Sequence, residues 1–268
     1  MAAAPLGEGP SWDPDSGQLT WVEINRGVLR QWRPSDGREQ SLELGAPLSF
    51  AVAREGGGWA VGRRDRIALI GLDGRESTLM AVADPPADTR FNDGKCDAAG
   101  RLWAGTMSTA RRPGDGRLYR VDAGGDAVVA IPSTTISNGL GWSPDNTLFY
   151  FVDSTTQAID VFDFDVDGGE IADRRRFAAI DPDDGLPDGL TVDAEGGVWV
   201  CLFGGGCVRR YDPAGRLDAA VELAISKPTS LAFGGPRLDR LYLTTALGGR
   251  ILEIEPGVRG LPGNRFPA

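Results

Sequence analysis

The sequence predicts an all-β fold: a six-bladed β-propeller with four-stranded antiparallel blades, formed by residues 1–268 as a single domain. Two observations support this prediction: a hairpin pattern that occurs six times along the chain, and a second hairpin that follows each copy of the first. In addition, no stretch has the sustained i, i+3, i+4 spacing of apolar residues that indicates an amphipathic helix.

The first hairpin consists of an apolar segment, a turn and an aromatic-rich strand, as in Asp193-Ala194-Glu195-Gly196 before Val198-Trp199-Val200. Apolar and polar residues alternate with a period of two, which is typical of strands, and Asp, Gly and Pro mark the turns. In chain order, from the turn to the following strand, the six copies are 11–22, 54–61, 97–104, 142–150, 193–200 and 234–243.

The second hairpin begins with a short strand such as Ile67-Ala68-Leu69-Ile70 and ends at a glycine-containing turn. Its six copies are 28–37, 67–74, 118–124, 159–168, 208–215 and 251–257. Two hairpins per repeat give four strands, and a repeat length of roughly 40–50 residues is that of a propeller blade. The alternative is a β-sandwich with regularly spaced turns, which would need all six copies to arise by coincidence.

The net charge of −10 and the pI of about 4.6 disfavour binding to nucleic acid or to an anionic membrane. Residues 1–5 lack the charged and apolar regions of a signal peptide, and no apolar run approaches the ~18 residues that cross a bilayer. We therefore expect a cytoplasmic protein, monomeric or weakly oligomeric, without nucleic-acid or membrane partners. Cys201 and Cys207 either face each other across a hairpin or are two separate buried residues.

Histidine is absent from the chain. Its absence excludes Ser-His-Asp and Cys-His catalysis and all imidazole metal ligands. Acid–base chemistry would therefore rely on Asp, Glu, Lys, Tyr or Cys.

One polar position recurs in every repeat. Equivalent residues in propeller blades point to the same place, and the first strand of each blade lines the central channel. The position five residues before the first turn residue is polar in all six copies, and we call this set the ring: Glu8, Ser49, Asn92, Asn138, Asp188 and Thr229.

Converging carboxylate and carboxamide oxygens suit a hard divalent cation. Glycine follows Glu8, Asn138 and Asp188 directly, which allows close approach of backbones and ligands. The spacing alone is equally compatible with polar residues that end strands and line a wet channel.

At these residues the sequence resembles the family of gluconolactonases, regucalcin (senescence marker protein 30) and related sugar lactonases. The resemblance covers roughly residues 6–255. The matching segments are 6–12, 90–95 with Asp97, 100–107, 136–140, 142–145, 187–189 and 193–196.

The resemblance implies a six-bladed propeller with one catalytic divalent metal ion, with Glu8, Asn138 and Asp188 as ligands and Arg90 and Asn92 as substrate contacts. Ca²⁺ or Zn²⁺ is expected first, and Mg²⁺, Mn²⁺ and Fe²⁺ are compatible with the same oxygen ligands. A surface salt bridge is the alternative for Arg90. Asp93 is expected in an Asx turn rather than in catalysis.

The chain departs from the family pattern in two places. Arg112 stands where regucalcin-like members carry an acidic substrate contact. In addition, only seven residues precede Glu8, fewer than in family members that use this segment as the outer strand of the last blade. We therefore expect the last blade to lack its outer strand or to be closed differently.

The function implied by the resemblance is metal-dependent hydrolysis of a small sugar lactone, with Asp188 as the general base. An aldonolactone of five or six carbons is the expected substrate class. Two alternatives remain: a propeller that binds calcium or a sugar acid without chemistry, and a propeller hydrolase acting on other esters.

Overall fold

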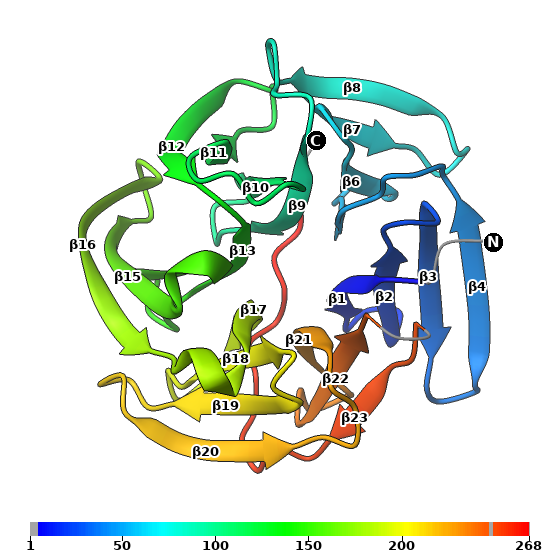
Figure 1. Ribbon diagram of the computed structural model, residues 1–268. Coiled ribbons are helices and arrows are strands. Elements are labelled where there is room, and N and C mark those ends of the chain that lie inside the picture. Colours follow the sequence, from blue (N-terminus) through cyan, green and yellow to red (C-terminus); the bar gives the residue numbers. More distant parts are fainter. Residues whose placement is uncertain (1–4, 247–248, 268) are drawn as a thin grey trace.

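The computed structural model describes residues 5–246 and 249–267, so residues 1–4 of the N-terminal segment lie outside the described part. Figure 1 shows six antiparallel sheets arranged around a central channel, which confirms the predicted six-bladed propeller. Each blade is formed by one continuous segment of chain, with its strands in chain order from the channel outward.

The first three blades each have four strands. Blade 1 contains β1 (Gly7–Asp13), β2 (Gln18–Glu23), β3 (Val28–Arg33) and β4 (Arg38–Glu43). Blade 2 contains β5 (Ala51–Ala53), β6 (Trp59–Gly62), β7 (Arg66–Ile70) and β8 (Glu76–Ala81). Blade 3 contains β9 (Thr89–Cys96), β10 (Leu102–Ser108), β11 (Gly116–Val121) and β12 (Ala127–Thr134).

Blades 4 and 5 also have four strands. Blade 4 contains β13 (Ser137–Trp142), β14 (Leu148–Asp153), β15 (Ala158–Asp165) and β16 (Glu170–Ala179), with the short 3₁₀ helix η1 (Ser154–Thr156) after β14. Blade 5 contains β17 (Leu186–Val192), β18 (Val198–Phe203), β19 (Cys207–Tyr211) and β20 (Leu217–Glu222), and η2 (Pro182–Asp184) precedes it.

Blade 6 contains β21 (Pro228–Gly234), β22 (Arg240–Thr245) and β23 (Leu252–Ile254). It has three strands among the described residues. The described residues include no helix that combines the length and apolar character needed to cross a membrane.

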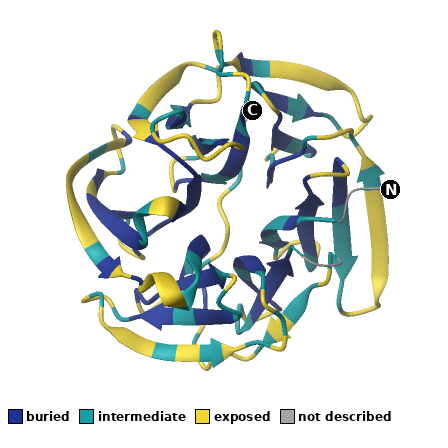
Figure 2. Cartoon of the chain, in the orientation of Figure 1, coloured by how far each residue is buried: buried dark blue, intermediate teal, exposed yellow. Residues whose placement is uncertain are grey.

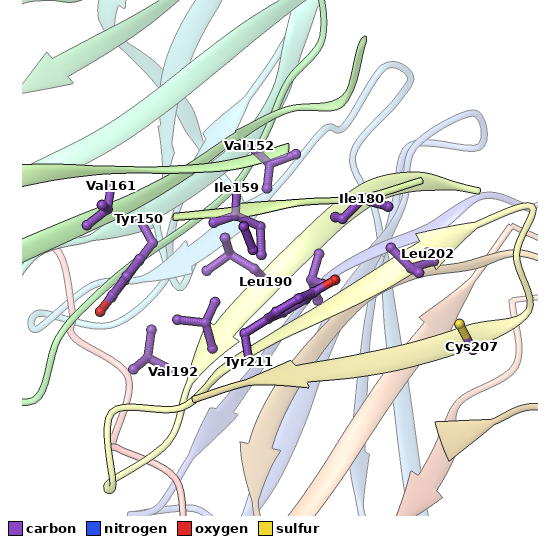
Figure 3. Close-up of a cluster of buried hydrophobic side chains, with 13 residues drawn as sticks. Tyr150, Val152, Ile159, Val161, Ile180, Leu190, Val192, Leu202, Cys207 and Tyr211 are labelled. Atoms are coloured by element: carbon purple, nitrogen blue, oxygen red, sulfur yellow. The ribbon is translucent and has the colours of Figure 1, made fainter. Parts of the chain in front are cut away.

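The core consists of six apolar clusters, one between each pair of neighbouring blades. Figure 3 shows one of them, in which Tyr150 and Val152 of blade 4 face Leu190 and Tyr211 of blade 5. Because both faces of an inner strand are covered by neighbouring blades, buried residues follow one another there, whereas outer strands such as β4 and β20 are exposed (Figure 2).

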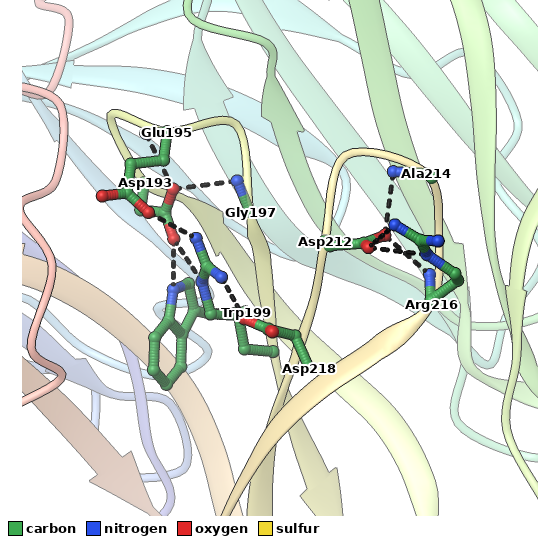
Figure 4. A network of polar contacts seen from close by, with 9 residues as sticks. Asp193, Glu195, Gly197, Trp199, Asp212, Ala214, Arg216 and Asp218 are labelled. Carbon is green, nitrogen blue, oxygen red and sulfur yellow. Dashed lines mark hydrogen bonds and ion pairs between the residues drawn. The ribbon is translucent and has the colours of Figure 1, made fainter.

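The repeated Asp turn also has a structural role. Asp193 accepts hydrogen bonds from the backbone N–H groups of Glu195 and Gly197 and from the Trp199 indole, whose Nε1 lies 2.8 Å from Oδ2 (Figure 4). Arg210 Nε lies 2.7 Å from the same oxygen. Asp97 and Trp103 repeat the indole bond at 2.9 Å in blade 3. This bond explains why an Asp turn precedes a tryptophan in both repeats, since a buried indole N–H needs an acceptor.

The C-terminal strap, residues 259–266, crosses the central opening after the last strand (Figure 1). It bonds to blade 5 through Ala194, to blade 1 through the Arg265–Asp13 ion pair, and to blade 2 through Phe266. Phe266 is fully buried in the cluster between blades 2 and 3. The strap therefore connects blades that are distant around the ring, which β-sheet pairing within each blade does not do.

The three cysteines are free and buried. Cys201 pairs with Val208 and Cys207 with Leu202 across β18 and β19. Because adjacent strand residues point to opposite faces, the two side chains lie on opposite faces of the hairpin, and the alternative of two separate buried residues is correct.

Candidate metal and substrate site

Five of the six ring residues lie on the innermost strands β1, β9, β13, β17 and β21, and Ser49 lies just before β5. In those five blades the strand register shifts at the ring position, as between Ser137 and Leu140 in β13 and between Pro187 and Leu190 in β17. Such a bulge redirects a side chain out of the regular alternation. The recurrent bulge is therefore what points the ring toward the channel.

The glycines after Asn138 and Asp188 are required by close packing of neighbouring inner strands. A Cβ on Gly139 would lie 2.5 Å from the backbone nitrogen of Leu190, and one on Gly189 would lie 2.2 Å from Ser230 Oγ. Real Cβ atoms do not come this close to other heavy atoms. The distances therefore confirm the expectation that glycine allows close approach of the backbones here.

Three ring residues bond to the next blade. Ser49 Oγ donates to the carbonyl of Phe91 at 2.6 Å, Asn92 Nδ2 to that of Ser137 at 3.0 Å, and Thr229 Oγ1 to that of Gly7 at 2.7 Å. Each acceptor immediately precedes the ring residue of the neighbouring blade. These three polar side chains thus join adjacent inner strands, a role that spacing in the sequence did not reveal.

The other three ring residues, Glu8, Asn138 and Asp188, form the predicted metal-binding set. Burial, followed by the Asp188 and Asp93 carboxylates, raises the pKa of Glu8 well above its usual value. Burial raises the pKa of Asp188 to about 8, the Asp93 charge adds to the rise, and a hydrogen bond with Asn138 opposes it. The blades thus bring Glu8 and Asp188, far apart in sequence, within electrostatic contact.

The side chain of Asn138 is fixed by a hydrogen bond to a residue outside the ring. Its Nδ2 atom donates to Ser154 Oγ at 3.0 Å, and Ser154 lies in η1, directly after β14 of the same blade. With an amide hydrogen engaged by Ser154, the amide oxygen is the group of Asn138 that remains suited to a cation.

Arg90 and Asn92 are brought together beside these carboxylates. Arg90 Nη1 lies 2.8 Å from Asn92 Oδ1 and 2.8 Å from the carbonyl oxygen of Phe91. Burial lowers the pKa of Arg90, whereas Glu8 and Asp188 raise it. Arg90 is therefore an inward-facing cation, and the alternative of a surface salt bridge is wrong.

Asp93 departs from its expected place in an Asx turn. It lies inside β9 with a side chain only 7% exposed, and its Oδ1 accepts a hydrogen bond from Gly94 N at 2.7 Å. Burial raises its pKa, and the nearby Lys95 lowers it. Asp93 lies in the bulge between Phe91 and Gly94, where the pairing of β9 with β10 is interrupted, and not in a turn.

Lys95 is a half-buried residue that we did not predict from the sequence. Its Nζ donates to the carbonyl oxygen of Leu190 at 3.0 Å. Burial lowers its pKa and Asp93 raises it. The signal was present in the sequence, because Lys95 is one of only two lysines in the chain and lies three residues after a ring position.

The residues present fit a divalent cation. Asp188 Oδ1 is buried without a hydrogen-bond partner in the described structure, so it presents an unsatisfied acceptor beside a second carboxylate. Within residues 5–246 and 249–267, no three acidic or cysteine side chains gather closely enough to ligate one ion. The donor set is therefore two carboxylates and one amide, all oxygen, which favours a hard cation with water completing its shell.

A cavity of about 290 Å³ occupies the channel on the side of the strap. Trp12, Trp142 and Phe233 contribute aromatic walls, Asp93 and Lys95 lie on its lining, and strap residues 261–264 border it. The predicted ligands and substrate contacts are absent from this lining. The cavity therefore lies next to the ring. Asp93 and Lys95 line the cavity and follow the ring residue Asn92 on β9.

The chain matches the family model described as SMP-30/gluconolactonase/LRE-like region over residues 6–247. It belongs to this family. The match includes all six ring residues and Arg90, so the SMP-30/gluconolactonase membership extends to the whole candidate site.

Three similar proteins illustrate the family. Regucalcin of Xenopus laevis is 36% identical, with 91% of this chain and 84% of that protein aligned. Pentonolactonase XacC of Haloferax volcanii is 37% identical, with coverage of 91% and 82%. The crystal structure of a regucalcin from Agrobacterium tumefaciens, described as a calcium-binding protein, superimposes with a TM-score of 0.93 at 27% identity, covering 100% of this chain and 96% of the other.

Arg112, where we expect a departure from the SMP-30/gluconolactonase pattern, is held by two acids. Its Nη2 lies 2.6 Å from Asp88 Oδ2 and its Nε 2.8 Å from Asp115 Oδ2, and the side chain is 53% exposed. Thr109 N also donates to the Asp88 carbonyl at 2.7 Å. These contacts link the 108–115 loop to the segment that leads into Arg90.

Proposed function

We propose that the protein hydrolyses a small sugar lactone with the help of one divalent metal ion held by Glu8, Asn138 and Asp188. The observation that carries this proposal is the Asp188 carboxylate, buried beside Glu8 with Oδ1 unpartnered among the described residues. Membership of a family that includes a named pentonolactonase supports the substrate class.

A divalent cation bound there supplies Lewis acidity, which polarises a carbonyl or lowers the pKa of water. Glu8 and Asp188 supply two negative charges for it, and Asn138 supplies a neutral oxygen oriented by Ser154. Oxygen ligands of this kind accept Ca²⁺, Zn²⁺, Mg²⁺, Mn²⁺ or Fe²⁺, and we expect Ca²⁺ or Zn²⁺ first.

Asp188 is the proposed general base. Its free Oδ1 can accept a proton from the attacking water, and the chain contains no histidine to do so. The water oxygen bonds to the lactone carbonyl carbon, the ring C–O bond breaks, and the former ring oxygen takes up a proton. The product is the open hydroxy acid.

Arg90 is the proposed substrate contact, because a buried guanidinium beside the carboxylates can bind the lactone oxygens. Asn92 holds Arg90 through Oδ1 and is joined to the next blade through Nδ2. We therefore propose that Asn92 serves substrate binding chiefly by orienting Arg90.

The test is a panel of five- and six-carbon aldonolactones against chelated protein reloaded with Ca²⁺, Zn²⁺, Mg²⁺, Mn²⁺ or Fe²⁺. Acid release should be near background after chelation and should return with at least one metal. If no metal restores hydrolysis of any aldonolactone above the rate in buffer, the proposal is wrong.

A second candidate is calcium binding without chemistry, favoured by the description of the Agrobacterium tumefaciens regucalcin as a calcium-binding protein. Calorimetric titration of the chelated protein separates the two candidates. Calcium binding without turnover of any lactone would support the second, and metal-dependent turnover would support the first. Hydrolysis of simple esters in preference to lactones would indicate an esterase instead.

A further inference from the structure

Lys95 occupies an unusual position for a lysine. It lies on the innermost strand β9, borders the cavity, and donates from Nζ to the main-chain carbonyl of Leu190 at 3.0 Å. An ammonium group that is partly removed from water, as here, is costly unless it is hydrogen-bonded and charge-compensated. Its presence here calls for a role beyond packing.

The Lys95–Leu190 bond joins blades that are not neighbours. Lys95 belongs to β9 of blade 3 and Leu190 to β17 of blade 5, and β13 of blade 4 lies between them around the channel (Figure 1). Lys95 thus reaches past the strand that carries Asn138 to the strand that carries Asp188.

The Leu190 carbonyl that Lys95 binds lies two residues after Asp188, at the end of the bulge between Pro187 and Leu190. A bulged strand has fewer ladder bonds to fix its path at that point. A cationic donor on the Leu190 carbonyl therefore restrains the segment that sets the position of the Asp188 carboxylate.

The charges around the ring are arranged consistently with this role. Asp188 and Asp93 raise the carboxyl pKa of Glu8, Asp93 also raises that of Asp188, and Arg90 lowers the pKa of both Glu8 and Asp188. Lys95 is the cation that lowers the pKa of Asp93. Asp93 and Lys95 thus place opposite charges next to the proposed metal-binding set.

We propose that Lys95 is a positioning residue of the metal site: by tying β9 to the Leu190 carbonyl on β17, it holds Asp188 in the geometry that binds the metal ion. This inference rests on the proposed function for its metal site but not on the identity of the lactone. Lys95 contacts neither substrate nor metal in this proposal.

Two physical effects of Lys95 predict opposite results. If only its charge mattered, its removal would make the site more negative and metal binding tighter. If its hydrogen bond positions Asp188, removal would loosen β17 and weaken binding, and loss of an outer partner of a metal ligand typically costs about 10–100-fold in affinity or activity.

The experiment compares Lys95→Met with wild-type protein and with Lys227→Met. Lys227 is the only other lysine, and it lies just before β21, over the Phe203 ring of β18, with Nζ 5.5 Å from the ring centroid. The chelated proteins are titrated calorimetrically with Ca²⁺ and with Zn²⁺. We expect Lys95→Met to weaken the Kd about 10–100-fold and Lys227→Met to leave it unchanged. Unchanged or tighter binding by a folded Lys95→Met protein would overturn the proposal.

A second measurement uses wild-type protein, in case Lys95→Met does not fold. With ¹³C-labelled lysine the NMR spectrum contains two lysine Cε signals, and Lys227→Met assigns them. Metal addition should shift the Lys95 signal and leave the Lys227 signal in place. A Lys95 signal that does not respond to a saturating metal concentration would contradict the proposal.

Activity gives the third measurement. Lys95→Met should lower kcat for the preferred lactone about 10–100-fold, with KM little changed, because it disturbs the base rather than the substrate contact Arg90. A lower Tm with wild-type kcat and Kd would indicate a purely structural lysine and would overturn the proposal. If the wild-type protein hydrolyses no lactone, the proposed function fails, while the metal titration and the NMR experiment still decide the role of Lys95.

Discussion

The amide nitrogen of Asn138 donates a hydrogen bond to Ser154 Oγ across 3.0 Å, so a serine outside the ring fixes the orientation of a proposed metal ligand. Ser154 is itself held by its position at the start of η1, where its backbone nitrogen donates to the Ile136 carbonyl at 3.1 Å. The Asn138 amide also hydrogen-bonds to the Asp188 carboxylate, so Ser154 and Asp188 together fix which way the amide faces.

Replacing this hydroxyl should weaken metal binding. Ser154→Ala removes the acceptor for Asn138 Nδ2, and we expect the metal Kd to rise about 10–100-fold, the usual effect of losing a partner of a ligand. Calorimetric titration of chelated protein measures the change, with the exposed turn variant Ser16→Ala as the control. Metal affinity equal to that of the control would show that Asn138 needs no such support.

Asp188→Asn should abolish lactone hydrolysis while retaining the fold. General bases contribute about 10²–10⁴-fold to the rate, so kcat should fall by at least about 10²-fold. The carboxylate is buried and Oδ1 lacks a partner in the described structure, so its neutral isostere should not lower the Tm of chelated protein. Initial rates and thermal unfolding test both statements, and wild-type activity in this variant would sink the assignment of Asp188.

The chelated protein should lose stability as pH rises from about 5 to about 8. The folded pKa of Asp188 is raised to about 8 from an ordinary value of 3.8, and that of Glu8 is also raised, so the folded state binds protons that the unfolded state has released. Their contribution is therefore fully present at low pH and is lost as pH rises through the folded pKa.

Urea unfolding at pH 5, 6.5 and 8 measures this dependence. The window lies above the lowered pKa values of surface acids such as Asp145 and the half-buried Asp212, so those groups stay ionised throughout. Asp188→Asn should flatten the slope. A free energy of unfolding that increases across this window in chelated wild-type protein would contradict the assigned pKa directions.

Arg90→Lys should reduce lactone turnover although it keeps the charge. Lysine lacks the planar guanidinium that bonds both Asn92 Oδ1 and the Phe91 carbonyl at 2.8 Å. Loss of hydrogen bonds to a charged group, about 1.5–3 kcal/mol each, corresponds to a fall in kcat/KM of about tenfold to a hundredfold. Arg174→Lys, on outer strand β16, is the matched control. Equal kcat/KM values for the two variants would remove Arg90 from the substrate site.

The C-terminal strap should contribute strongly to stability. Phe266 is fully buried between blades 2 and 3, and Phe266→Ala should lower the free energy of unfolding by about 3–5 kcal/mol. Leu72→Ala, at a leucine that is 79% exposed, should change it by less than about 0.5 kcal/mol. Denaturant unfolding compares the two, and similar small effects would show that the strap rests loosely on the blades.

Much of the fold was predictable because propeller blades are repeats. The alternation of strand residues and the Asp turns before Trp103 and Trp199 are local patterns, and each blade folds from one continuous segment. The strap was not predictable, because its partners Asp13 and Ala53 are more than 200 residues away and no local pattern marks them.

The sequence by itself determined the six repeats, the ring positions and the absence of histidine, since counting along equivalent strands depends only on local spacing. The tertiary structure alone decided how the ring divides. It made Ser49, Asn92 and Thr229 links between blades, left Asp188 Oδ1 without a partner among the described residues, and placed Lys95 against Leu190. The physical reason is that bulges and cross-channel contacts depend on how neighbouring blades close around one axis, and residues from different blades meet only when that closure is complete.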